Sequence, residues 1–242
     1  MSRILNGLNS AQLAAVTAPD GPVLVLAGPG SGKTRVLTHR IAYLIHETGV
    51  DPREIIAVTF TNKAAREMRH RVEGLLEGDL RGVQVGTFHS NCARILRIEA
   101  GKGNLPLTPE YVIYDTSDQL SLMKAIISGD LRLDDKRYRP ERILARISQA
   151  KNDFVMPDTF KAETYLDEIV LRAYETYQQR LVTNNAVDFD DLLLQVALLF
   201  RDRPDVLARY QNRYRHVLVD EFQDTNITQY NLVRALGGKH QN

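Results

Sequence analysis

Short apolar runs alternate with longer amphipathic stretches toward both ends of this sequence. The apolar runs predict strands at about 23–27, 55–60, 83–87 and 216–219. Apolar residues at helical spacing predict helices at about 33–46, 62–76, 89–99 and 226–236. Apolar strands that alternate with amphipathic helices indicate an α/β fold, in which helices cover both faces of a parallel sheet.

The strand pattern nearly disappears in the middle of the sequence. Residues 101–109 are rich in Gly and Pro and read as a linker. Helical spacing follows at about 117–128, 140–151 and 160–182, and we expect the tyrosines of the last helix to pack rather than to stack on bases. We therefore divide the chain into an α/β domain, residues 1–100 and 187–242, and an inserted all-α subdomain, residues 101–186.

The composition excludes several classes of protein. With 242 residues the chain can form one large or two small domains with a substantial core. One cysteine, Cys92, excludes an intramolecular disulfide framework, and the six histidines are scattered. No apolar run is long enough to span a membrane and the N-terminus does not look like a secretory signal, so we expect a cytoplasmic protein with no membrane partner.

Charge by itself does not point to a ligand. The formal net charge is +1, so the chain lacks the overall basic excess of many nucleic-acid-binding proteins. Between Arg132 and Lys151, however, seven basic residues stand against three acidic ones. This stretch is either a solvated helix face or a patch that contacts phosphates.

A glycine-rich segment follows the first predicted strand and opens the first long helix. Gly28, Gly30 and Gly32 have no Cβ, so the backbone can turn successive N–H groups toward a phosphate, and the helix adds its positive N-terminal end. Lys33 would reach the β- and γ-phosphates, and the hydroxyl of Thr34 would bind Mg²⁺. Ala27 stands where the phosphate-loop pattern has its first Gly, which is a mild departure. A dinucleotide-binding turn is excluded because its last Gly would fall on Lys33.

Two adjacent carboxylates end the last predicted strand. Asp220 would hold Mg²⁺, directly or through water, while Glu221 would orient and deprotonate an attacking water. The alternative is that both acids only cap and charge the helix that follows. Together with the phosphate loop upstream, they predict a site that hydrolyses a nucleoside triphosphate.

Several further segments resemble one family. Residues 57–68 (AVTFTNKAAREM), 86–90 (GTFHS), 188–193 (DFDDLL), 220–224 (DEFQD) and 8–12 (LNSAQ) are similar to motifs of the superfamily 1 DNA helicases of the UvrD/Rep/PcrA type. The resemblance extends from Leu8 to about Leu236. It implies a RecA-like P-loop NTPase fold with an inserted helical subdomain that contacts DNA, and ATP with Mg²⁺ as the cofactors.

The resemblance also assigns roles to individual residues. Gln12 would read the adenine ring with its amide, and Arg35 would lie near the nucleotide or in solvent. The predicted nucleotide-binding residues are Gln12, Gly28, Pro29, Gly30, Ser31, Gly32, Lys33, Thr34 and Arg35. The predicted DNA-binding residues are Phe60, Thr61, Asn62, Thr87, Phe88 and His89. Either aromatic could instead be a core residue, and the histidine could be structural.

The resemblance implies partners as well. We expect single-stranded DNA and its junctions with duplex DNA as ligands, movement in the 3′ to 5′ direction, and repair or replication proteins as partners in a bacterial cytosol. We also expect the chain to be the first part of a longer helicase, whose second RecA-like domain supplies arginines to the transferring phosphate. The alternatives are a P-loop kinase or another NTPase, and a nucleotide-gated DNA-binding module without turnover.

Overall fold

The computed structural model describes residues 3–28, 30–77 and 82–242. The chain divides into two compact units, which we call the α/β unit and the helical unit. The α/β unit comprises Met1–Asn91, Arg203–Thr225 and Val233–Asn242, and the helical unit comprises Cys92–Asp202 and Asn226–Leu232. Their bounds differ from the predicted boundaries near residues 100 and 187, and the functional labels of the two predicted domains stay predictions.

A parallel sheet of three strands forms the centre of the α/β unit. Its strands are β1 (Ile55–Thr59), β2 (Gln84–Thr87) and β5 (His216–Val219), in the order β2-β1-β5. Every residue of β1 is buried, which explains its continuous apolar sequence. The register pairs Thr59 with Thr87 and Val58 with Val219, so the carboxyl ends of all three strands meet at one edge of the sheet.

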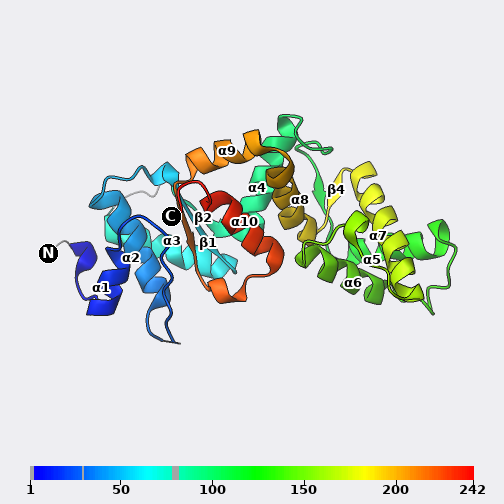
Figure 1. Cartoon of the computed structure of the whole chain (residues 1–242), viewed down its shortest axis with the longest axis horizontal. Coiled ribbons are helices and arrows are strands. Elements are labelled where there is room, and N and C mark those ends of the chain that lie inside the picture. The colour runs from blue at the N-terminus through cyan, green and yellow to red at the C-terminus, as the bar shows by residue number, and fades with distance from the viewer. Residues whose placement is uncertain (1–2, 29, 78–81) are drawn as a thin grey trace. The chain divides into compact units, whose positions relative to one another are not determined.

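Helices α2 (Lys33–His46) and α3 (Asn62–Leu76) pack together beside this sheet (Figure 1). Their apolar faces bury Ile41, Leu44 and Met68 against Ile55 and Ala57 of β1. Both helices span the predicted ranges, and each has a defined N-cap residue that fixes where it begins. Gly32 is the N-cap of α2, and the hydroxyl of Thr61 caps α3 by accepting from the backbone of residue 64.

The predicted strand at 23–27 is wrong. These residues form no strand, and the side chains of Val23, Leu24 and Leu26 are 51%, 70% and 87% exposed. A strand needs a hydrogen-bonding partner, and the free edge of β5 is already occupied: the N–H of Val217 donates to the carbonyl of Asn242 at 3.1 Å. The Asn242 side chain in turn accepts from the N–H of Gly21. Apolar character alone therefore does not make this segment a strand.

The helical unit contains the helices predicted in the middle of the chain and one that was not predicted. Predicted were α5 (Thr116–Ala125, continued by a π-helical turn over Ile126–Asp130), α6 (Pro140–Asn152) and α7 (Tyr165–Thr183). Helix α8 (Phe189–Asp202) and the short parallel strands β3 (Val112–Ile113) and β4 (Ala186–Val187) were missed. Tyr174 and Tyr177 are completely buried, as their packing role predicts, whereas Tyr165 is 64% exposed.

The remaining elements are short or join the two units. They are α1 (Ser10–Val16), α4 (Phe88–Gly101), α9 (Pro204–Arg213), α10 (Ile227–Gly237), and 3₁₀ turns at Arg3–Leu5, Pro52–Glu54, Pro157–Thr159 and Phe222–Asp224. Sequence reasoning missed α1 and α9. In the part of the chain that the structure describes, no helix has both the length and the apolar character to cross a membrane.

Candidate nucleotide site

The glycine-rich loop leads directly into α2, as predicted. Gly30 and Gly32 have φ angles of 75° and 87°, a left-handed conformation that glycine adopts without a steric penalty. A Cβ added at Gly28 or Gly30 would meet no atom within 4 Å, so the space above the loop is open. The backbone is therefore shaped for an anion at the N-terminus of α2. Pro29, also predicted to bind nucleotide, lies outside the described residues.

Gln12 joins helix α1 to this loop. Its Nε2 donates to the carbonyl of Ser31 at 3.0 Å, while its Oε1 accepts from the backbone N–H of Asn9 at 3.1 Å. Among the described residues these two hydrogen bonds leave the second N–H and the second lone pair of the amide for a ligand. The side chain also lies against Gly32, where an added Cβ would come within 3.0 Å of Nε2. Gln12 thus lies beside the predicted phosphate site, with its adenine contact still a prediction.

The two halves of the predicted site come together. Lys33 Nζ lies 3.3 Å from Glu221 Oε2, and the hydroxyl of Thr34 donates to Asp220 Oδ2 at 3.3 Å. Strand β5 positions the acids, because the N–H of Asp220 donates to the carbonyl of Val58 in β1 at 2.9 Å. The predicted base and the predicted metal ligand each lie next to the matching residue of the phosphate loop.

The two carboxyl groups have different environments. Burial, followed by the negative charge of Glu221, raises the pKa of Asp220 above its ordinary value. The pKa of Glu221 is lowered, first by a hydrogen bond from Gln223 Nε2 at 2.6 Å and then by Lys33. Gln223 and Lys33 thus both favour the ionised form of Glu221. Sequence reasoning missed Gln223; the only signal was an amide two residues after the predicted base.

The backbone at Glu221 adopts an unusual conformation. Its φ of 52° and ψ of 45° lie in the left-handed region that residues other than glycine rarely adopt. Such a conformation persists only where the surrounding structure holds it, and it occurs often at functional sites. It turns the chain sharply between β5 and the 3₁₀ turn at Phe222–Asp224.

The oxygens at this position fit a magnesium ion. Asp220 Oδ1 is buried and has no hydrogen-bond partner among the described residues, and its other oxygen already faces the Thr34 hydroxyl. No group of three or more His, Cys, Asp or Glu that could hold a metal ion occurs in residues 3–28, 30–77 and 82–242. Mg²⁺ suits such a site, because it uses one or two carboxylates together with waters and substrate phosphates.

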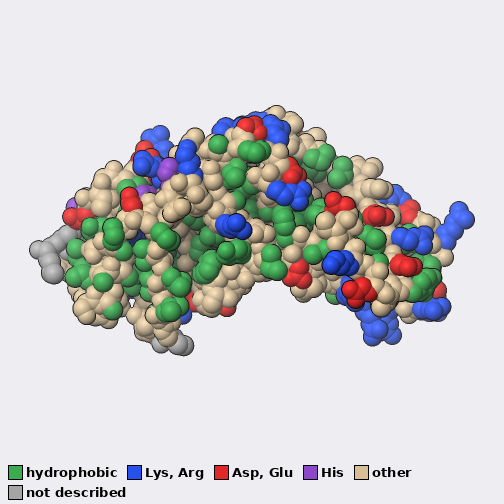
Figure 2. Space-filling model, in the orientation of Figure 1, with side chains coloured by type: hydrophobic (Ala, Val, Ile, Leu, Met, Phe, Trp, Pro, Cys, Tyr) green, Lys and Arg blue, Asp and Glu red, His purple; other side chains and the backbone are tan. Residues whose placement is uncertain are grey.

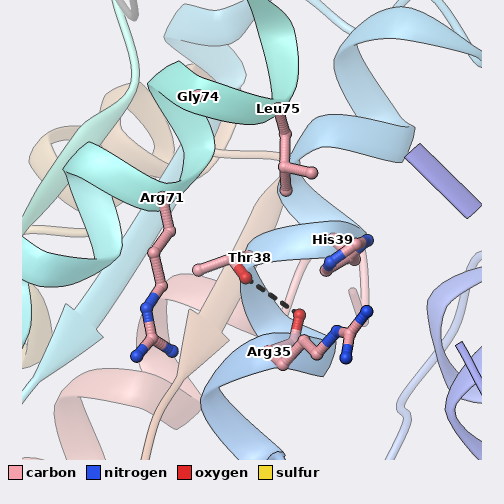
Figure 3. Close-up of a pocket in the computed structure, with 6 residues that line it drawn as sticks. All are labelled: Arg35, Thr38, His39, Arg71, Gly74 and Leu75. Atoms are coloured by element: carbon pink, nitrogen blue, oxygen red, sulfur yellow. Dashed lines mark hydrogen bonds between the residues drawn. The ribbon is translucent and has the colours of Figure 1, made fainter. Parts of the chain in front are cut away.

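Arg35 lies at the margin of a shallow hollow between α2 and α3 (Figure 3). This hollow has a volume of about 310 Å³, and its lining also includes Thr38, His39 and Arg71. The Thr38 hydroxyl donates to the carbonyl of Arg35 at 2.9 Å, and Arg71 is paired with Glu67 on its own helix. Arg35 is exposed, and its guanidinium lies next to Gly7.

The predicted DNA-binding residues lie at the carboxyl ends of β1 and β2. Because Thr59 pairs with Thr87, the turns that follow these strands are neighbours. The rings of Phe60 and Phe88 meet edge to face with centroids 5.6 Å apart, and Phe88 is only 4% exposed. Phe88 therefore packs in this structure, whereas Phe60 is half-buried.

The polar residues beside these aromatics also have structural roles. Thr61 caps α3, and the hydroxyl of Thr87 accepts from the N–H of Ser90 at 3.1 Å. Asn62 is exposed in the first turn of α3, and His89 is half-buried in the first turn of α4. The DNA contacts of all six residues stay predictions.

The basic stretch of the helical unit lies largely at its surface. Figure 2 shows Lys and Arg side chains spread over the part of the helical unit that contains α5, α6 and α7. The exposed members of the stretch are Arg132, Lys136, Arg137, Arg139, Arg142 and Arg146. Arg146 is paired with Asp167 and Arg137 stacks on Tyr138, whereas Lys151 is completely buried.

Known proteins resemble this chain along its whole length. The UvrD/REP helicase N-terminal domain family matches residues 8–242. The chain is 46% identical over 243 residues to the ATP-dependent DNA helicase PcrA of Bacillus subtilis, which covers 100% of this chain and 32% of that protein. It is 47% identical over 242 residues to the PcrA of Leuconostoc citreum, covering 99% of this chain and 32% of that protein.

These relatives are much longer than the chain, which spans about a third of their length. The family match nevertheless includes the phosphate loop, both acids of β5 and the helical unit between them. The chain therefore belongs to the UvrD/REP helicase N-terminal domain family.

Proposed function

We propose that this chain is the ATP-binding part of an ATP-dependent DNA helicase, which couples ATP hydrolysis to 3′ to 5′ movement on single-stranded DNA. The observation that carries the proposal is the double pairing of Lys33 with Glu221 and of Thr34 with Asp220. A phosphate loop and two acids at a strand end have separate structural explanations. Their convergence on one point is what a nucleotide hydrolysis site requires.

Each residue of the site has a chemical role. The backbone of the glycine-rich loop and Lys33 bind the β- and γ-phosphates, and Thr34 with Asp220 would hold Mg²⁺. The ion would neutralise charge that develops on the phosphate oxygens. When Lys33 turns to the phosphates, it leaves Glu221, whose carboxylate is then available to accept a proton from the attacking water.

Movement on DNA needs a second domain that contacts the nucleotide from the other side. We propose that a second RecA-like domain supplies the arginines, which are worth about 10³–10⁵ in rate in related phosphoryl-transfer enzymes. Single-stranded DNA would pass over the carboxyl ends of β1 and β2, where Phe60 and its neighbours lie. We place the protein in the cytosol, in DNA repair or replication.

Two other functions predict different behaviour. A P-loop kinase or another NTPase would turn over ATP without a response to DNA, whereas single-stranded DNA should stimulate the helicase. A nucleotide-gated DNA-binding module would bind both ligands but would not hydrolyse ATP. Turnover measured with and without single-stranded DNA in the full-length protein separates the three.

Calorimetry with Mg²⁺·ATP on the 242-residue chain tests the proposed nucleotide site. Lys33→Ala should weaken binding by about tenfold or more, because a charge-assisted hydrogen bond contributes about 1.5–3 kcal/mol. Lys136→Ala is the matched control, since it removes an exposed lysine of the helical unit and should leave the affinity unchanged. Equal affinity of the wild type and Lys33→Ala would remove the nucleotide site from this position.

A further inference from the structure

The carboxylate of Glu221 meets two donors at the same oxygen. Gln223 Nε2 donates to Glu221 Oε2 at 2.6 Å, and Lys33 Nζ lies 3.3 Å from that oxygen. Within the described part of the chain, neither of these contacts uses Oε1, which is left for another proton donor. All three side chains belong to the α/β unit. The carboxylate is thus held through one oxygen and open at the other.

A tight turn places Gln223 beside Glu221. The left-handed Glu221 precedes the 3₁₀ turn at Phe222–Asp224, and the N–H of Asp224 donates to the carbonyl of Glu221 at 2.9 Å. A 3₁₀ turn rises only about 2 Å per residue, so side chains two positions apart stay within reach of each other. The backbone therefore keeps the Gln223 amide close to the carboxylate.

The turn does not need the side chain of Gln223. Its hydrogen bonds join backbone atoms, and the Thr225 hydroxyl donates to the carbonyl of Phe222 at 2.8 Å. The Gln223 amide has one further contact, with Asp224 Oδ2, but this contact is 3.4 Å long, against 2.6 Å for the contact with Glu221. The shorter contact is the stronger hydrogen bond. The main partner of Gln223 is therefore the predicted base.

The two donors to Glu221 differ in what nucleotide binding does to them. The ammonium group of Lys33 is attracted to phosphates, and in the proposed function it turns away from Glu221 to reach them. The amide of Gln223 is neutral and stands two residues from Glu221, so it remains as the donor to Oε2. A remaining donor matters because the last torsion of a glutamate side chain has only broad preferences, and an unheld carboxylate rotates.

We propose that Gln223 is a positioning residue, which holds Glu221 through Oε2 and so directs Oε1 at the attacking water. This inference rests on the proposed function, in which Glu221 is the general base. The water gives its proton to Oε1 and its oxygen forms a bond to the γ-phosphorus. The bond from that phosphorus to the β,γ-bridging oxygen breaks, and its electron pair leaves with ADP. Gln223 exchanges no atom in this step.

Single-turnover hydrolysis of Mg²⁺·ATP by the full-length protein, with single-stranded DNA, tests this role. Gln223→Ala should lower the hydrolysis rate about 5- to 20-fold, because a misdirected carboxylate accepts the proton less often. The affinity for Mg²⁺·ATP should change by less than about twofold, since the amide acts on the base and not on the phosphates.

Two further variants sharpen the comparison. Gln223→Glu keeps the length and shape of the side chain but replaces the donor with a second negative charge, so it should be at least as slow as Gln223→Ala. Gln179→Ala is the matched control, because it removes an exposed glutamine of α7 and should keep the wild-type rate.

A double variant separates positioning from a general loss of structure. In the Glu221→Gln background, adding Gln223→Ala should not slow hydrolysis further, because Gln223 acts only through the carboxylate that is already gone. A role in the turn or in folding would reduce the rate by the same factor in both backgrounds.

The possible failures are distinguishable. A wild-type rate in Gln223→Ala, or an equal loss with and without Glu221→Gln, would overturn the inference and leave the proposed function intact. A full-length wild type that does not hydrolyse ATP, or Glu221→Gln that hydrolyses it normally, would instead remove the proposed base and the role of Gln223 with it.

Discussion

The Thr34 hydroxyl donates a hydrogen bond to Asp220 Oδ2 at 3.3 Å, although the two residues are 186 positions apart in the chain. A neighbouring pair also meets: Lys33, one residue before Thr34, lies 3.3 Å from Glu221, one residue after Asp220. The start of α2 and the end of β5 are thus in contact through two adjacent pairs of side chains. All four side chains belong to the α/β unit, so their effect on nucleotide binding can be measured on this chain.

The first prediction concerns magnesium. Asp220→Asn should remove most of the Mg²⁺ dependence of ATP binding, because a neutral amide is a poor ligand for a hard cation. Titration of ATP with Mg²⁺ or with EDTA measures this dependence. Asp224→Asn changes a carboxylate four residues away and serves as the control. Full Mg²⁺ dependence in Asp220→Asn would assign the metal to other oxygens.

A second prediction separates binding from turnover. In the full-length protein, Glu221→Gln should bind Mg²⁺·ATP but hydrolyse it about 10²–10⁴-fold more slowly, because the proton acceptor is lost while the shape is kept. Steady-state hydrolysis with single-stranded DNA, together with nucleotide affinity, gives both quantities. Normal turnover would show that another group accepts the proton.

A third prediction concerns the buried ion pairs of Lys151 with Asp188 and Asp191. Lys151→Met should lower the free energy of unfolding by about 3–5 kcal/mol, because two buried carboxylates lose the buried cation that pairs with both of them. Burial alone would lower the pKa of Lys151, but Asp191 and Asp188 raise it above its ordinary value, so the lysine is charged. Urea unfolding measures the loss. Lys136→Met at the surface should stay within about 0.5 kcal/mol.

The pH dependence of stability gives a fourth prediction. Burial and the charge of Asp188 raise the pKa of Asp191 from 3.8 to about 6. A raised pKa means that the folded chain binds this proton more tightly than the unfolded chain does. The contribution of Asp191 is therefore complete below pH 3.8 and is lost as the pH rises through about 6. The pKa of Asp188 is lowered, so its effect on stability has the opposite sign. Its contribution to the free energy of unfolding is present above pH 3.8 and is lost only as the pH falls below that value.

Comparison with Asp191→Asn isolates this contribution. The stability of the wild type relative to Asp191→Asn should increase when the pH falls from about 7 to about 5, because the asparagine does not titrate. Urea unfolding at the two pH values measures the difference. A relative stability that falls over this range would mean that Asp191 is ionised more easily in the folded chain than in the unfolded chain.

The exposed apolar segment at 23–27 gives the last prediction. Leu26→Glu should change the free energy of unfolding by no more than about 0.5 kcal/mol, because 87% of this residue is already in water. Ile56→Ala in β1 should cost about 2–5 kcal/mol, since Ile56 is 2% exposed. Urea unfolding of both variants measures the two changes in the free energy of unfolding. Equal losses would show that Leu26 is buried in solution.

The sequence predicted most of the α/β unit correctly because the signals there are local. Helices α2 and α3 were placed at Lys33–His46 and Asn62–Leu76 from apolar spacing. Helix α8 was missed because its apolar residues are nearly continuous. Seven of the eight residues at 192–199 are leucine, valine or alanine, the exception being Gln195, and such a run has no clear period. In the middle of the chain, apolar spacing therefore predicted only the helices that have a single apolar face.

The sequence by itself determined the phosphate loop, the two acids at the end of β5 and the family, because each depends on residue types at short spacing. Only the tertiary structure decided that residues 23–27 are not a strand. An apolar pattern does not tell whether a neighbouring strand is available to form hydrogen bonds with the segment. It also decided that Lys151, counted in sequence as part of a basic surface stretch, is the buried partner of Asp188 and Asp191. The link from Asn152 to Asn226 spans 74 positions. Contacts at such separations depend on how helices pack, and no local pattern contains that information.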